Sequence, residues 1–109
     1  MVHAHTDSAD VLSLVGDLDV SGASRFVVQA GCALRQGATR LVIELGDVPY
    51  IDSAGLAALL NVLRRVRSAG AAMVLVSVQP HVRELLDQTQ LDREFTFANT
   101  LDEAEAALN

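Results

Sequence analysis

Ser53 is the residue of this chain whose surroundings most suggest chemistry. It lies in the stretch YIDSAGLAALL, directly before an apolar run with helical spacing. A serine at a helix start can be structural, because its oxygen can accept a backbone N–H bond as an N-cap. It can also be a site of modification, since Ala54 and Gly55 are too small to shield the hydroxyl and Gly55 lets another surface approach the backbone. Position alone leaves both interpretations open.

A serine hydrolase would be the enzymatic use of Ser53. The nucleophile elbow of such enzymes reads G-x-S-x-G, but Ile51 occupies the first glycine position here. His81 is the only histidine downstream, and we expect it on the surface at the start of a helix, so no catalytic triad is predicted. We therefore expect no enzymatic activity and no catalytic residue.

Metal and cofactor sites are also not expected. His3 and His5 share one face of a predicted strand, which gives two metal ligands, but no third ligand is evident nearby, so surface histidines are predicted. Cys32 is the only cysteine; it excludes an intramolecular disulfide and is expected to be an inert thiol on the outward face of a helix. No glycine-rich phosphate-binding loop is present, and no cofactor is predicted.

The composition fits one compact domain over residues 1–109. The net charge of −6 argues against binding to nucleic acid, which requires concentrated positive charge. No signal peptide and no apolar run long enough for a bilayer are found. We expect a cytoplasmic protein whose partners include neither nucleic acid nor membrane.

The elements that must position Ser53 follow from turn and capping signals. Strands over residues 2–6 and 11–15 flank DSAD and predict a hairpin. The loop GDLDVSG carries Asp17 and Asp19, and Ser21 is the expected N-cap of the helix that follows. Further elements are a helix ending at Gly37, a strand over 40–45, a helix over 53–69 ending at Gly70, a strand over 73–78, a helix over 80–88, a strand over 95–97 and a last helix opened by the capping box of Thr100 and Glu103.

The predicted helices each carry an apolar stripe facing a core. The stripes consist of Ala23, Phe26, Val27, Ala30, Ala33 and Leu34, then Leu56, Leu59, Leu60, Leu63 and Val66, and finally Val82, Leu85 and Leu86. Alternating helices and strands with short connections predict parallel strands with right-handed crossovers, so the fold class is α/β with a mixed sheet and about four helices. Ser53 then lies beyond the carboxyl end of a strand, where functional loops of such sheets lie.

Three segments of the chain resemble the STAS domain, named after sulfate transporters and anti-sigma factor antagonists. DSAGL, preceded by LVIELGDVPYI and followed by AALLNVLRRVRSAG, resembles the family signature. GDLDVSGA resembles its G-E-L-D segment, and VRELLDQTQLDREF resembles its third helix and the following turn. The chain departs from the family at Gln90, where a glycine is usual, at Glu44, where Asp is common, and at Ala54, where many members have a second serine. The last departure leaves Ser53 as the single candidate for modification.

The resemblance implies a bacterial anti-sigma factor antagonist without catalytic activity. Such a protein binds an anti-sigma factor that is also a serine kinase and thereby releases a sigma factor. The kinase ends the interaction by phosphorylating the motif serine, here Ser53, and a phosphatase resets it. The residues expected at the partner surface are Asp17, Asp19, Asp52, Ser53, Ala54, Gly55 and Leu56.

Several of these carboxylates also have simpler interpretations. Asp52 could orient the serine hydroxyl, help hold a metal–nucleotide complex in the kinase, or only stabilise the helix start. Asp17 and Asp19 could contact the partner or be solvated loop residues. These alternatives stay open from the sequence.

A second function within the same family is another binding role. The chain could be the STAS subunit of a lipid-transporting ABC system or part of a stress-signalling assembly, binding its partner without a phosphorylation switch. The cytoplasmic tail of a transporter would need a preceding membrane segment. The acidic charge and the intact D-S-x-G-L motif favour the antagonist.

Overall fold

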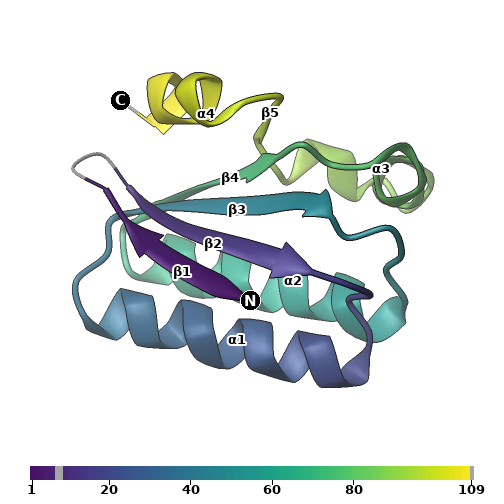
Figure 1. Cartoon of the computed structure of the whole chain (residues 1–109), viewed down its shortest axis with the longest axis horizontal. Coiled ribbons are helices and arrows are strands. Elements are labelled where there is room, and N and C mark those ends of the chain that lie inside the picture. The colour runs from purple at the N-terminus through teal and green to yellow at the C-terminus, as the bar shows by residue number, and fades with distance from the viewer. Residues whose placement is uncertain (7–8, 109) are drawn as a thin grey trace.

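The computed structural model describes residues 1–6 and 9–108. One sheet contains five strands in the order β1-β2-β3-β4-β5, with β1 antiparallel to β2 and the other neighbours parallel (Figure 1). The strands are β1 (Val2–His5), β2 (Asp10–Val15), β3 (Arg40–Asp47), β4 (Ala72–Val76) and β5 (Phe97–Ala98). The helices are α1 (Val20–Arg35), α2 (Ser53–Ser68), α3 (Pro80–Gln88), α4 (Leu101–Leu108) and the short 3₁₀ helix η1 (Leu91–Arg93). The predicted α/β class and mixed sheet are confirmed.

Helices cover both faces of the sheet. Helices α1 and α2 lie on one face and α4 lies on the other (Figure 1). Strand β3 is apolar on both sides because Leu41 and Ile43 face the α1–α2 layer, whereas Val42 packs with Ala104 of α4. This two-sided burial explains why the β3 sequence is a dense apolar run rather than an alternating one.

The predicted helix stripes and ends are largely confirmed. Buried stripe residues are Ala23, Phe26, Ala30, Ala33, Leu59, Leu63, Val66, Val82 and Leu86, and the remaining members are partly buried. Gly37 and Gly70 follow α1 and α2 with φ of +97° and +70°, which favours glycine. The Glu103 N–H donates to Thr100 Oγ1 at 3.1 Å, and the Glu103 carboxylate accepts from the Asn99 N–H at 2.8 Å. The second bond of this capping box therefore falls one residue earlier than in the usual motif.

Three predicted strands have ends shifted by two residues or more, and the first of them, β3, extends to Asp47 rather than residue 45. Strand β4 stops at Val76 rather than residue 78, because Ser77 adopts a left-handed φ of +57° that no strand can continue. Strand β5 covers Phe97–Ala98 rather than residues 95–97, and Phe95 is instead buried in the core. The hairpin is antiparallel as predicted, and Asp7 and Ser8 of its predicted turn lie outside the described residues.

Candidate functional site

Two loops meet where β2 and β3 end, and together they form the surroundings of Ser53. The Leu18 N–H donates to the Tyr50 carbonyl at 3.0 Å, and the Asp52 N–H donates to the Leu18 carbonyl at 3.4 Å. These bonds form an isolated parallel bridge between Leu18 and Ile51. The loop that carries Asp17 is therefore held beside the loop that leads into α2.

The N-cap of α2 is Asp52, so of the two interpretations that the sequence left open for Ser53, the cap is wrong. The Asp52 side chain accepts the Gly55 N–H at 3.0 Å, so the capping bond is made by the residue before the serine. Helix α1 begins in the same way, with Asp19 accepting the Gly22 N–H at 3.1 Å, and the expected cap at Ser21 is also wrong. Both helices open with the pattern D-x-x-G, in which the carboxylate reaches the amide three residues on.

Ser53 is consequently the first helical residue, and its side chain is exposed. Within residues 1–6 and 9–108, its hydroxyl has no hydrogen-bond partner. The Ser53 and Ala54 N–H groups also lack protein partners in this part of the chain, as expected for the first turn of a helix. The serine is free for chemistry because a neighbour has taken the capping role.

Gly55 is buried. The surface that approaches its backbone closely belongs to this protein and not to a partner. A Cβ at this position would collide with the Leu18 carbonyl oxygen and with the Ile51 side chain. The glycine thus allows the two loops to pack together at the start of α2. Ala54 and Leu56 are partly buried, and both pack against the core.

Carboxylates surround the serine. Asp17, Asp19 and Asp47 are exposed, and Asp52 is half-buried. Among the described residues, none of these four forms an ion pair with a basic side chain. The loops beside Ser53 therefore carry several exposed carboxylates without salt bridges, and Arg25 is a basic residue that lines the same pocket as Asp17.

An aromatic pair joins the loop before α2 to α3 and was not anticipated from the sequence. The rings of Tyr50 and His81 stack with centroids 5.9 Å apart and planes inclined by 15°. Nearby, the Gln79 side chain donates to the Gly46 carbonyl at 2.7 Å and fixes the residue before α3 against the end of β3. The signal available in the sequence was only that the chain's single tyrosine comes two residues before Asp52.

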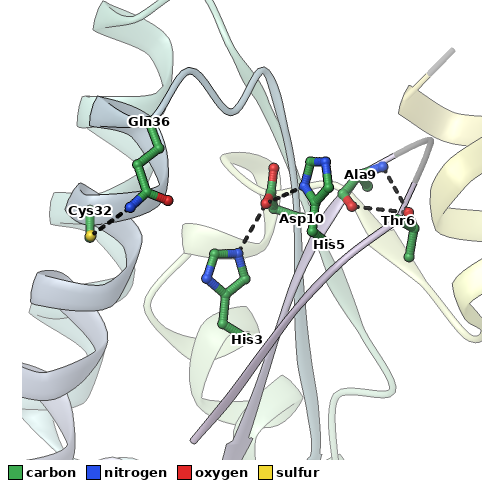
Figure 2. Close-up of polar contacts among 7 residues, drawn as sticks. All are labelled: His3, His5, Thr6, Ala9, Asp10, Cys32 and Gln36. Atoms are coloured by element: carbon green, nitrogen blue, oxygen red, sulfur yellow. Dashed lines mark hydrogen bonds and ion pairs between the residues drawn. The ribbon is translucent and has the colours of Figure 1, made fainter.

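His3 and His5 are exposed, as predicted, and both also contact a carboxylate that the sequence did not indicate. His3 Nε2 and His5 Nδ1 lie 3.0 and 2.8 Å from Asp10 Oδ1, a carboxylate on the neighbouring strand (Figure 2). Burial acts to raise the pKa of Asp10, but the hydrogen bonds and charges of His5 and His3 outweigh it, and the pKa is lowered. Asp10 is the only buried charged residue among those described.

The described residues contain no group of three or more His, Cys, Asp or Glu side chains that could hold a metal ion. Cys32 is half-buried rather than fully outward, and its sulfur lies 3.6 Å from Gln36 Nε2, which donates to it (Figure 2). None of the helices described is both long and apolar enough to cross a bilayer.

Fold and site together define a small α/β domain that presents an exposed serine among carboxylates. The family model for the STAS domain matches residues 2–104. The chain belongs to the STAS domain family.

Relatives with known names and structures agree with this family. BtrV of Bordetella bronchiseptica, provisionally named an anti-sigma factor antagonist, is 31% identical over 93% of this chain and 87% of its own. The crystal structure of a provisionally named anti-sigma factor antagonist from Thermotoga maritima matches with a TM-score of 0.91 and 28% identity, over 98% of this chain and 92% of that chain. SpoIIAA of Bacillus in its phosphorylated form shares the fold, with a TM-score of 0.76 and 22% identity, over 99% of this chain and 98% of that chain.

Proposed function

We propose that this protein is an anti-sigma factor antagonist that is switched off by phosphorylation of Ser53. In the unphosphorylated state it binds an anti-sigma factor with serine kinase activity and so releases a sigma factor. A phosphatase acting on phospho-Ser53 restores binding. The protein itself catalyses nothing in this scheme.

One observation carries the proposal. Asp52 caps α2, which leaves the hydroxyl of Ser53 exposed and without a structural task. Family membership and the names of the similar proteins support the same function. The phosphorylated form of SpoIIAA is an instance of this fold carrying the modification.

The surroundings of Ser53 supply a physical basis for the switch. A phosphate adds about −1.5 to −2 charge at neutral pH. It would enter an acidic surface that includes Asp17, Asp19, Asp47 and Asp52, and would repel a partner that had accommodated a neutral hydroxyl. The unpaired Ser53 and Ala54 N–H groups and the dipole of α2 favour an anion locally, so the fold should persist. The switch would therefore act at the interface.

The predicted partner-binding residues take different parts in this proposal. Asp17, Ser53 and the exposed parts of Asp19, Asp52 and Ala54 would meet the partner directly. Gly55 is buried and Leu56 is partly buried, so they would act mainly by holding the loop in place. The acidic surface favours a partner with a basic face.

Capture of partners by four baits tests the proposal. The baits are the wild type, Ser53→Ala, Ser53→Asp and Ser68→Asp, and the source is a lysate of the native organism. Ser68→Asp introduces the same charge at the exposed far end of the same helix and is the matched control. Retained proteins are identified by mass spectrometry, and a retained kinase is then incubated with ATP and wild-type protein to locate the phosphate.

The proposal requires that the wild type, Ser53→Ala and Ser68→Asp retain an anti-sigma factor kinase and that Ser53→Asp does not. The kinase must also place its phosphate on Ser53. If Ser53→Asp and the wild type retain the same ABC-type ATPase or stress-signalling proteins, and no kinase is found, the phosphorylation switch is wrong and the other STAS roles take its place.

A further inference from the structure

We propose that the stacked pair Tyr50 and His81 is the apolar anchor of the partner interface, beside the serine that switches it. This inference rests on the proposed function, because it concerns the same partner. It adds residues of the loop before α2 and of α3, which the D-S-x-G motif does not include. It also states what the partner must present: an apolar side chain surrounded by basic groups.

The pair lies on the surface that contains Ser53. The Tyr50 carbonyl is bonded to Leu18, and Ser53 follows three residues later on the same chain segment. His81 is the second residue of α3, and the Gln79 to Gly46 bond holds the start of that helix against the end of β3, the strand that leads into the tyrosine's loop. The Tyr50–His81 stack thus places the loop before α2 beside the start of α3.

Tyr50 lies on the surface and is not part of the hydrophobic core. Its residue exposure is 46%, although the chain buries its three phenylalanines at least partly and has few aromatics. His81 is also exposed. The stack holds the tyrosine ring in one orientation without burying it, so a partner would meet a pre-formed aromatic face with little ordering to do.

Val20 is a second exposed apolar residue, and it lies at the start of α1. Val20 is the first residue of α1, as Ser53 is of α2, and it is 70% exposed. The loops before the two helices are joined through Leu18. The anchor region, defined as Val20, Tyr50 and His81, therefore adjoins the acidic residues around Ser53.

The composition of this surface sets the chemistry of the partner. Tyrosine is enriched among the residues that dominate binding energy, and such residues are ringed by polar contacts that exclude water. Asp17, Asp19 and Asp47 are exposed where β2 and β3 end, and their negative charge matches basic side chains on the partner. A phosphate on Ser53 would hinder the approach of an apolar group to the anchor, which links this contact to the switch.

The test uses the anti-sigma factor kinase that the wild-type protein captures. Calorimetry measures the dissociation constant of its complex with the purified wild type and with each variant. Tyr50→Ala should weaken binding by at least about tenfold. Tyr50→Phe keeps the ring and should stay within about threefold of the wild type. Val28→Ala, on an exposed apolar residue of α1 two turns from Val20, is the matched control and should not change binding. His81→Ala should fall between the two tyrosine variants, since it removes only the support of the ring.

Folding is checked by circular dichroism and urea unfolding, and the Tyr50 carbonyl that bonds Leu18 is retained in every variant. If Tyr50→Ala binds within twofold of the wild type while Ser53→Asp does not bind, the anchor is wrong and the phosphorylation switch stands. If the wild type captures no kinase, the proposed function is wrong and the anchor falls with it.

Discussion

The carboxylate of Asp52 accepts a hydrogen bond from the Gly55 N–H at 3.0 Å. From the sequence, Ser53 could have been the N-cap of α2 or a site of modification. The bond assigns the cap to Asp52. Asp52 closes the start of α2, and Ser53 is left exposed. Asp19 and Gly22 form the same bond at the start of α1. Both α1 and α2 therefore begin with a D-x-x-G cap.

Loss of the cap should reduce stability without touching the serine. Asp52→Ala removes the acceptor of the Gly55 N–H and should lower the free energy of unfolding by about 0.5–2 kcal/mol, measured by urea unfolding. Asp52→Asn keeps an acceptor and should cost less. Equal stability of the Ala variant and the wild type would mean that Ser53 can take over the cap.

Two glycines in helices should respond to alanine in opposite directions. A Cβ at Gly55 meets the Leu18 backbone oxygen, which cannot move aside, so Gly55→Ala should destabilise by about 1–3 kcal/mol or more. A Cβ at Gly31 meets only the ends of Arg35 and Arg65 at 3.4 Å, and alanine is the better helix former by about 0.5–1 kcal/mol. Gly31→Ala should therefore be neutral or stabilising. Urea midpoints of the two variants that shift alike would contradict this difference.

The order of elements could be predicted from the sequence because local signals decide it. Apolar periodicity, the glycines after α1 and α2, and Pro80 at the start of α3 all act within a few residues. The caps were misplaced by one or two residues because serine and aspartate are both good N-caps. At α2, Asp52 caps the helix where Gly55 packs against Leu18. This contact joins the first turn of α2 to the loop before α1, which no local sequence pattern indicates.

Contacts between distant segments could not be predicted. The bonds of His3 and His5 to Asp10 depend on the register of two strands and on which face each side chain takes. The stack of Tyr50 on His81 depends on how α3 meets the loop before α2. Neither leaves a local pattern in the sequence, so both required the three-dimensional fold.

Ser53→Asp should leave the fold unchanged. Aspartate in the first turn of a helix gains about 0.3–1 kcal/mol from the dipole, which offsets repulsion from the adjacent Asp52. The free energy of unfolding should stay within about 1 kcal/mol of the wild type, with the same circular dichroism spectrum. Global unfolding of this variant or of the phosphorylated protein would contradict a switch that acts only at the interface.

The backbone at Gln90 should be strained, and glycine at this position should relieve the strain. It adopts a left-handed φ of +61°, a conformation that favours glycine over residues with a Cβ. Gln90→Gly should raise the free energy of unfolding by about 0.5–1 kcal/mol, since it removes a conformation that residues with a Cβ disfavour. Glutamine at position 88, in α3, provides the control: Gln88→Gly should destabilise because it lies within a helix.

Asp10 should make stability depend on pH in a way that His3 and His5 determine. Because the pKa of the folded state lies below the unfolded value of 3.8, the ionised carboxylate contributes stability above pH 3.8 and loses it as the pH falls through the lower folded value. In His3→Ala/His5→Ala, burial acts unopposed and should raise the pKa of Asp10 above 3.8. The contribution of this carboxyl then reverses sign: it costs stability at neutral pH, and the cost disappears as the pH falls towards 3.8.

Urea unfolding across this pH range measures the difference between the two proteins. The double variant should lose on the order of 1–3 kcal/mol relative to the wild type at neutral pH, and less near pH 3.8, because a buried carboxylate without partners is costly only while charged. Asp10→Asn introduced into both the wild type and the double variant removes the titrating carboxyl from each and should abolish the pH dependence that Asp10 gives to the difference. A constant difference between wild type and double variant at every pH would mean that the histidines support strand β1 by packing alone and do not interact with the charge of Asp10.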